Sequence, residues 1–589
     1  MMNNIQERWK QRIRIALLEL AEKQGIDTSQ VPADEIPVET PPRLELGDAA
    51  FPLFAFARVF KRSPANLAEE IVQNIASSGV SETEGEARAT GPYVNVFFHR
   101  PSYFSSVIAE AVTQDHSYGQ TDTLSGQRVM VEFSCPNTNK PLHLGHLRND
   151  IIGESVSRIL AANGADVRKV NLINDRGIHI CKSMLAYERF GNGTTPESEG
   201  VKSDHFVGNY YVRFNQWAKD DPSADDSARK MLQAWEDGEA HTIELWKQMN
   251  KWALDGIWKT YEHTGISFDQ VYFESDTYVE GRKEVLKGLE QGAFYRDSDG
   301  SVWVDLEEIS LDKKVLLRSD GTSLYLTQDI GTAIARHRDW AFDRLIYVVG
   351  SEQRYHFTVL FHVLEKLGME WAGQLYHLAY GMVNLTEGKM KSREGTVVDG
   401  DDLLAKLEAL AAEEIRSKER EEAVGNIEET AGSIALGALH YYLLQTSPNK
   451  DMIFDPAESL SFNGNTGPYL QYMGARISSM LRRIQGEKRA APEEIDFSLL
   501  TVAEEWELIR LLGEYPDRVR MAGEQYNPQV IAAYLYDLAK TFSRYYHDNP
   551  IVTGDDRAVR EARIALTTAL LAVLRSGFDL IAIPFLETM

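Results

Sequence analysis

The sequence predicts an α/β protein in which a parallel-sheet domain lies between a short N-terminal α/β module and a C-terminal all-α helical bundle. The central domain is indicated by strand-like runs at 129–133, 168–173 and 344–349, which alternate with segments of helical periodicity. Such alternation is typical of doubly wound parallel sheets. After about residue 428 the apolar spacing is helical almost throughout, which predicts the bundle.

The N-terminal module is indicated by a helix-like segment at 66–75 and by a strand-like run at 93–98 that follows a Gly-Pro pair. A chain of 589 residues is too long for one hydrophobic core, so several domains are expected. A segment at about 193–262, rich in Trp, Lys, Glu and Asp, is predicted to be an insertion in the central domain. The predicted domains span 1–121, 122–427 and 428–589.

Composition and charge exclude several classes of protein. Hydrophobic residues make up 43% of the chain and charged residues 25%, which is unlike a disordered protein. Two cysteines, Cys135 and Cys181, are too few for a disulfide scaffold or a four-cysteine zinc site, and they fit a reducing compartment. A net charge of −26 argues against a protein that coats nucleic acid without specificity. Because no membrane span or signal peptide is recognisable, we expect a cytoplasmic enzyme.

The most specific motif contains His143, Gly145 and His146, between a predicted strand and a predicted helix. Two histidines three residues apart in a first helical turn lie on one face, where free N–H groups and the helix dipole favour an anion such as a triphosphate. Gly145 would let a base or ribose approach the backbone. A chance His-x-Gly-His is expected about 0.02 times in a chain of this composition, so two unrelated surface histidines are a weak alternative. A zinc site would need further ligands that the neighbouring sequence does not supply.

A second motif brings three cations, Lys389, Lys391 and Arg393, into five residues of a glycine-flanked loop. Alone, such a cluster is more often a solvated surface loop than a catalytic one. Together with the histidine motif it favours cations that stabilise the charge on a leaving pyrophosphate.

The two motifs, in this order, resemble the signatures of the class I aminoacyl-tRNA synthetases. Segments 131–137, 146–149, 325–329 and 347–353 make the resemblance closest to the arginyl-tRNA synthetases, and it is weakest at 193–262. The resemblance implies a split Rossmann catalytic domain that activates L-arginine with ATP and transfers it to the 3′-terminal adenosine of its tRNA. Mg²⁺ would arrive with ATP, and no structural zinc is expected.

The cation loop departs from the pattern common in class I enzymes. Its fourth position is Ser392, and the second lysine stands one place early, at Lys391. In arginyl enzymes a lysine just before the first signature histidine is thought to compensate for the lysine that is missing from the fourth position of the loop. Lys140 matches the position of that compensating lysine. The resemblance therefore implies catalytic roles for Lys140 and Lys389 first. The full expected catalytic set is Lys140, His143, His146, Lys389, Lys391 and Arg393.

The resemblance also implies the substrate contacts. A guanidinium is a planar fork of five donors, so its pocket should offer carboxylates. Asp329, one helical turn after Tyr325, and Glu274 match the positions that hold the guanidinium in the family. The α-amino group of arginine should be bound by Glu132, Asn137 and Gln353. The ATP site should comprise His143, Gly145, His146 and Lys389, with Gly381, Met382 and Val383 at the adenine.

The expected partner is the arginine tRNA, and neither DNA nor a membrane is expected to bind. Tyr469, Tyr472 and Arg476 share one helical face that could stack unpaired bases and meet a phosphate. The alternative is an aromatic stripe in the bundle core. The resemblance implies that the bundle binds the anticodon and that the N-terminal module contacts the outer corner of the tRNA. A monomer is expected, although the sequence itself does not determine the oligomeric state.

Three other functions remain open from the sequence. Another class I synthetase would need a different pocket, with cations for glutamate or zinc thiolates for cysteine. A small nucleotidylyltransferase shares the histidine motif but needs no helical bundle. A tRNA-binding module with an inactive site would not need His143, His146 and Lys389 together.

Overall fold

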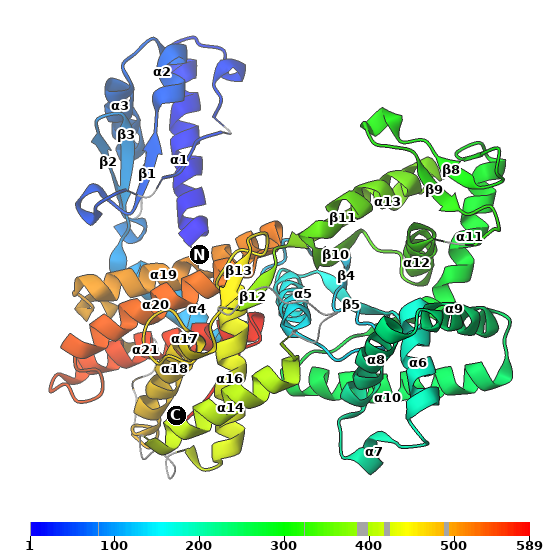
Figure 1. The fold of residues 1–589 in the computed structure, drawn as a ribbon. Coiled ribbons are helices and arrows are strands. Elements are labelled where there is room, and N and C mark those ends of the chain that lie inside the picture. Colours follow the sequence, from blue (N-terminus) through cyan, green and yellow to red (C-terminus); the bar gives the residue numbers. More distant parts are fainter. Residues whose placement is uncertain are drawn as a thin grey trace. The chain divides into compact units, whose positions relative to one another are not determined.

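The computed structural model describes residues 2–33, 35–39, 41–79, 82–322, 324–385, 398–417, 424–487, 490 and 494–589 (Figure 1). The chain forms two compact units, each built from separate stretches of sequence. One unit comprises Met1–Gly119, Arg476–Arg518 and Leu535–Ser576, and the other comprises Gln120–Ala475, Val519–Tyr534 and Gly577–Met589.

A five-stranded parallel sheet lies at the centre of the second unit. Its strand order is β11 (Leu375–Tyr380), β10 (Arg344–Gly350), β4 (Arg128–Glu132), β5 (Asp166–Ile173) and β6 (Gln270–Phe273). The chain builds the sheet outward from β4 in one direction and then returns to add β10 and β11 on the other side. Ligands of open α/β sheets bind outside the carboxyl ends of the strands, where the order reverses. The predicted parallel-sheet domain is confirmed, and its switch point lies between β4 and β10.

Helices bury the apolar side chains of this sheet. Those that bear on the site are α5 (Leu144–Ala162), α6 (Ile178–Phe190), α11 (Glu274–Glu290), α12 (Tyr325–Asp339), α13 (Arg354–Lys366) and α14 (Gly400–Ser417). Val170 and Leu345 of the sheet pack in one core with Ile330 and Leu360. Helices α11 and α12 lie so close that a Cβ on Gly281 would be 1.8 Å from the carbonyl oxygen of Thr327, which explains the glycine. The short antiparallel strands β7 (Tyr295–Arg296), β8 (Val302–Val304) and β9 (Lys314–Leu317) connect the two helices.

The segment expected to be an insertion is helical. It contains α7 (Pro196–Glu199), α8 (Ser203–Asp220), α9 (Ser223–Glu236) and α10 (Ala240–Thr264). Helices α8, α9 and α10 pack with α6 around a core of their own, which includes Met184, Phe206, Phe214 and Trp252.

The C-terminal part of the chain is also mainly helical, as the apolar spacing predicts. Its helices are α16 (Ile427–Leu444), α17 (Pro456–Ser459), α18 (Gly467–Arg482), α19 (Ala503–Gln525), α20 (Gln529–Asp548) and α21 (Arg557–Leu580). Periodicity gave no sign of the three-residue strand β13 (Met452–Phe454), which pairs in parallel with β12 (Val383–Leu385). Among the helices that the structure describes, none has both the length and the apolar character that a bilayer crossing requires.

The N-terminal segment of the first unit combines an antiparallel sheet with helices. Strands β1 (Ala49–Pro52), β3 (Tyr93–Phe97) and β2 (Glu86–Thr90) lie in that order, with α1 (Met2–Lys23), α2 (Phe54–Phe60), α3 (Pro64–Ser77) and α4 (Arg100–Gln114). Helix α3 begins where the sequence favours it, because Ser63 accepts a hydrogen bond from the N–H of Asn66 (3.2 Å) and Pro64 occupies the first turn. The predicted helix and strand of this module are therefore confirmed.

Candidate active site

The histidine motif forms the N-terminus of α5. His143 is the N-cap, and its Nδ1 accepts a hydrogen bond from the N–H of Gly145 (3.1 Å), while its own N–H donates to Nδ1 of His146 (3.0 Å). Because both Nδ1 atoms are acceptors, each neutral ring carries its hydrogen on Nε2. Burial, with Lys140 nearby, lowers the pKa of His143 to about 4. Burial and the neighbouring His143 hold the pKa of His146 well below its ordinary value. The motif therefore presents two neutral Nε2–H donors at neutral pH.

Gly145 has a local role in this arrangement. A Cβ at this position would lie 3.0 Å from Cε1 and 3.1 Å from Nδ1 of His143. The glycine thus leaves room for the imidazole that caps the helix, in addition to any ligand that approaches the backbone.

Two residues in the left-handed backbone region lead from β4 into this motif. They are Ser134 (φ 73°) and Cys135 (φ 50°). The N–H of Ser134 donates to Oδ1 of Asn149 (2.6 Å), and the N–H of Cys135 donates to Oδ1 of Asn171 (3.1 Å). Such a conformation is costly for residues with side chains and persists where the surroundings fix it. Sequence reasoning missed both asparagines as supports, although Asn149 lies in a segment that carries the family resemblance.

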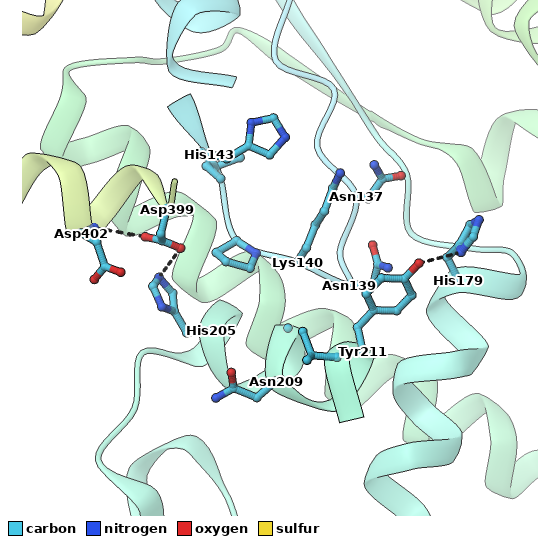
Figure 2. A pocket seen from close by; sticks show the side chains of 14 residues that line it. Asn137, Asn139, Lys140, His143, His179, His205, Asn209, Tyr211, Asp399 and Asp402 are labelled. Atoms are coloured by element: carbon cyan, nitrogen blue, oxygen red, sulfur yellow. Dashed lines mark hydrogen bonds and ion pairs between the residues drawn. The ribbon is translucent and has the colours of Figure 1, made fainter. Parts of the chain in front are cut away.

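Lys140 lines a cavity of about 480 Å³ together with Asn137, Asn139 and His143 (Figure 2). Its other walls come from α8, which contributes Asn209 and Tyr211, and from the residues just after the cation loop. Burial lowers the pKa of Lys140, whose ammonium makes no hydrogen bond or ion pair with the residues that the structure describes. The ammonium is therefore available to an anionic ligand.

The segment that follows the cation loop runs beside the histidine motif. The N–H of Leu144 donates to the carbonyl of Val398 (3.2 Å), and the N–H of Gly400 donates to the carbonyl of Leu142 (2.9 Å). Lys389, Lys391 and Arg393 themselves lie outside the described residues.

Glu274 and Asp329 lie close enough for their charges to interact. Burial and the carboxylate of Asp329 raise the pKa of Glu274 to about 7, although Arg176 acts in the opposite direction. With its amide oriented to satisfy both neighbours, Gln328 donates to Oε1 of Glu274 (2.7 Å) and accepts from Arg176 (3.1 Å). Nε2 of His356 bonds to Oδ2 of Asp329 (2.6 Å). Within the part of the chain that the structure describes, the second oxygen of each carboxylate can therefore accept from a further donor.

The arrangement of these two acids suits a cationic ligand. The carboxylate of Asp329 raises the pKa of Glu274, and a positive charge between the two acids would favour the ionised form of Glu274. Arg176 does not supply a positive charge that both acids share, because its guanidinium pairs with Glu236 (2.9 Å) and stacks over the ring of Tyr278 (4.0 Å). The sequence analysis did not predict roles for His356 and Arg176, which no short motif distinguishes, or for Gln328, although Gln328 lies in segment 325–329, which carries the resemblance.

The remaining residues expected to bind arginine are spread around the switch point. Glu132 ends β4 and forms a buried ion pair with Arg336, and burial raises its pKa despite that partner. Asn137 follows in the loop after β4 and lines the cavity. Gln353 is exposed in the 3₁₀ turn after β10, and Tyr325 is exposed at the start of α12. Glu132 thus has an internal partner that the sequence did not predict.

The three residues expected at the adenine differ in their contacts. Gly381 is pressed against the chain at Lys450, because a Cβ there would be 2.4 Å from the carbonyl carbon of that residue. The N–H of Met382 donates to Asp451 (2.7 Å), and its carbonyl accepts from Arg148 (3.0 Å) and from the N–H of Met452 (2.9 Å). The polar backbone groups of Met382 are thus already engaged by the protein. Val383 begins β12.

One acidic cluster resembles a metal site. Ligand atoms of Asp204, His205 and Asp401 lie within 4.8 Å of one another. Lys202 already supplies a positive charge there, since its ammonium donates to Asp204 (3.1 Å) and Asp401 (2.6 Å). We therefore assign no metal to this cluster.

The residues expected to contact tRNA lie on α18. Tyr469, Tyr472 and Arg476 are each half-buried, whereas Leu470 and Met473 on the same helix are buried. The guanidinium of Arg476 stacks over the ring of Tyr546 (4.3 Å). The three residues are thus not part of the fully buried core.

Comparison with known proteins agrees with this geometry. Three family models match the chain: "Arginyl tRNA synthetase N terminal domain" at residues 7–98, "tRNA synthetases class I (R), catalytic domain" at 107–456 and "DALR anticodon binding domain" at 470–589. The chain is 54% identical to the arginine–tRNA ligase of Treponema denticola and 52% identical to that of Treponema pallidum, and each match covers 100% of both chains. Its fold is similar to the solved arginyl-tRNA synthetase of Thermus thermophilus, with a TM-score of 0.80 at 26% identity over 98% of this chain and 100% of that one. The chain belongs to the class I arginyl-tRNA synthetase family.

Proposed function

We propose that this chain charges the arginine tRNA in two steps at the switch point of the parallel sheet. In the first step a carboxylate oxygen of arginine bonds to the α-phosphorus of ATP, and the bond to pyrophosphate breaks. In the second step a ribose hydroxyl of the terminal adenosine attacks the carbonyl carbon, and AMP leaves. Neither step needs a nucleophile from the protein, because positioning and charge stabilisation are sufficient. The observation that carries the proposal is the pair of carboxylates, Glu274 and Asp329, which lie close enough for their charges to interact.

Arginine would place its guanidinium between these two acids. Each carboxylate has one oxygen bonded to the protein and one that can accept a guanidinium N–H, which suits a planar donor fork. Tyr325 would form an exposed aromatic wall one helical turn before Asp329. The α-amino group would then bind near Glu132, Asn137 and Gln353, at the ends of β4 and β10.

The phosphates of ATP would lie at the N-terminus of α5. His143 and His146 would donate from Nε2 to phosphate oxygens, and Lys140 would supply a positive charge from the wall of the cavity. Neutral histidines suit this task, because they can donate a hydrogen bond that strengthens as charge develops on the phosphate. Lys389, Lys391 and Arg393 would add cations from the loop, and Mg²⁺ would be bound mainly by the phosphates.

Adenine would be bound by the backbone of Val383. The carbonyl of Met382 points toward β13, where it accepts from Met452. In a trans peptide the following N–H points the opposite way, and in a strand the N–H and C=O of one residue share a side. The N–H and C=O of Val383 therefore face away from β13 and could bind N1 and the 6-amino group of adenine. Gly381 and Met382 would act through packing, with the Met382 side chain exposed beside the base.

Transfer RNA would contact both units. Tyr472 and Arg476 lie in the segment that matches the anticodon-binding family model, and Tyr469 lies one residue before that segment on the same helix. These side chains could stack bases and meet a phosphate. Domain limits at residues 121 and 427, an insertion at 193–262, a monomeric state and a cytoplasmic location belong to the same proposal.

An exchange assay tests this function. Incorporation of labelled pyrophosphate into ATP would be measured with each of the twenty amino acids, with and without total tRNA. We expect exchange with arginine alone. Exchange with another amino acid, or none with arginine in the presence of tRNA, would contradict the proposal.

A further inference from the structure

Arg148 is a buried arginine that is held by carbonyl groups. It has 0% exposure, and its guanidinium donates to the carbonyls of Gly381 (2.6 Å), Met382 (3.0 Å), Pro448 (3.4 Å) and Lys450 (2.8 Å). No carboxylate of the described chain accepts a hydrogen bond from it. Burial lowers its pKa to about 10, so it remains charged at neutral pH. A buried charge is expensive, and its position therefore invites a functional explanation.

Arg148 connects the histidine motif, where the phosphates of ATP would bind, to the segment after β11, where adenine would bind. It lies two residues after His146 on α5, and it bonds to the segment that begins where β11 ends. The next residue, Asn149, donates to the carbonyl of Val348 in β10 (2.8 Å) and accepts from Ser134 after β4 (2.6 Å). The pair thus bonds to the carboxyl ends of three neighbouring strands at the predicted ligand edge.

Two consecutive peptide units are fixed on either side of Met382. In the Gly381–Met382 unit the carbonyl accepts from Arg148 (2.6 Å) and the N–H donates to Asp451 (2.7 Å). In the Met382–Val383 unit the carbonyl accepts from Arg148 (3.0 Å) and from the N–H of Met452 (2.9 Å). Rotation of the second unit would also rotate the N–H of Val383, which belongs to it, and the first unit is joined to the second through the Cα of Met382. The direction of the Val383 backbone edge therefore depends on these bonds.

We propose that Arg148 and Asp451 are positioning residues for ATP, which fix the two peptide units on either side of Met382 so that the backbone N–H and C=O of Val383 face the adenine ring. The inference rests on the adenine contact in the proposed function. Neither side chain touches the nucleotide. Arg148 acts from inside the protein and Asp451 from the surface, where its carboxylate also interacts electrostatically with Arg148.

Asp451 provides the safer variant, because it is exposed. Asp451→Ala removes the acceptor of the Met382 N–H, and we expect the KM for ATP to rise about tenfold, which corresponds to about 1.4 kcal/mol. Asp451→Asn keeps an acceptor oxygen and should restore most of the affinity, with a KM within about threefold of the wild type. Arg148→Lys keeps the charge but cannot reach four carbonyls, so it should raise the KM for ATP at least as much as Asp451→Ala.

The assay is pyrophosphate exchange with saturating arginine and tRNA, with thermal unfolding as a check on folding. The KM for arginine should change less than twofold in all variants, which a general structural defect would not produce. Asp27→Ala is a matched control, because it removes a similar carboxylate bond to a backbone N–H (Ser29, 3.0 Å) in the N-terminal module. Its KM for ATP should stay within twofold of the wild type.

The triphosphate of purine riboside, which lacks the 6-amino group, distinguishes the adenine contact from the positioning role of Arg148 and Asp451. The wild type should strongly prefer ATP to this analogue, and Asp451→Ala and Arg148→Lys should reduce that preference. If the wild type uses both nucleotides equally, the adenine contact is wrong. If the wild type discriminates but Asp451→Ala retains both the KM for ATP and the discrimination, the positioning role is wrong, whether or not Arg148→Lys folds.

Discussion

Replacement of Glu274 by glutamine should make arginine binding weaker and nearly independent of pH. The carboxyl group has a pKa of about 7 because it is buried and lies near Asp329. A bound guanidinium would favour the ionised form, so binding should lower this pKa and release a proton at neutral pH. Arginine affinity is then full above pH 7 and decreases as the pH falls through 7.

The size of the effect follows from the pKa. At pH 6 about one Glu274 in eleven is ionised, and at pH 8 about ten in eleven, so the Kd for arginine should rise about tenfold between pH 8 and pH 6. Glu274→Gln removes one charged acceptor of the guanidinium and should cost about 2–5 kcal/mol of binding. The variant should unfold at a higher temperature than the wild type at pH 8 without arginine. A carboxyl group whose pKa is raised from 4.5 to about 7 stabilises the fold only in its protonated form, and about 3 kcal/mol of that stability is lost as the pH rises through 7.

Isothermal titration calorimetry measures the affinity and the proton release, and a thermal unfolding scan at pH 8 measures the unfolding temperature. Titrations at pH 6, 7 and 8 in buffers of different ionisation enthalpy give both the Kd and the number of protons released. Asp276→Asn is the matched control, because Asp276 is an exposed acid in the same helical turn, and it should leave the Kd unchanged. Any pH dependence that remains in Glu274→Gln would report the Asp329–His356 pair. A wild-type Kd that stays constant from pH 6 to pH 8 without proton release would contradict the role of ionised Glu274 in binding the guanidinium.

Three further predictions concern the other groups of the site. His146→Ala should lower the rate of arginine activation by about 10²-fold or more with little change in ATP affinity, because its Nε2–H acts on charge that grows in the transition state; a change confined to the KM for ATP in steady-state exchange would contradict this role. Asp329→Asn should cost about 2–5 kcal/mol in discrimination between arginine and citrulline. Equal selectivity in wild type and variant, measured as the ratio of kcat/KM values, would rule out the pairing. Arginine-dependent exchange should be near background without tRNA and restored by the cognate tRNA, because a tRNA with higher affinity for the active arrangement of the site would raise the population of that arrangement, and Lys140→Ala should abolish the restored activity. Full exchange in RNA-free protein would refute the tRNA requirement, and an active Lys140→Ala variant would exclude the compensating lysine.

The sequence predicted those features that depend on local patterns. Strand-like runs at 129–133 and 344–349 lie within or next to β4 and β10, because a buried parallel strand is apolar over its whole length. The helix start at His143 could also be read locally, since the N-cap and first turn involve only neighbouring residues. The two motifs and their order indicated the family. Each motif is short, and backbone geometry fixes the spacing of its residues within one strand, turn or helix, so the motif can be recognised in the sequence alone.

Only the tertiary structure decided which distant groups meet. Arg148 bonds to carbonyls that lie 233 to 302 residues further along the chain, and Glu132 pairs with Arg336 on another helix. Periodicity reports which face of a helix is buried, but it does not identify the partner of a buried polar group. Arg148 and Gln328 both lie in segments that carry the family resemblance, but the sequence alone does not show which groups their side chains contact. Their roles arise because the sheet order brings β4, β10 and β11 together and because α11 and α12 pack closely enough to place Glu274 beside Asp329.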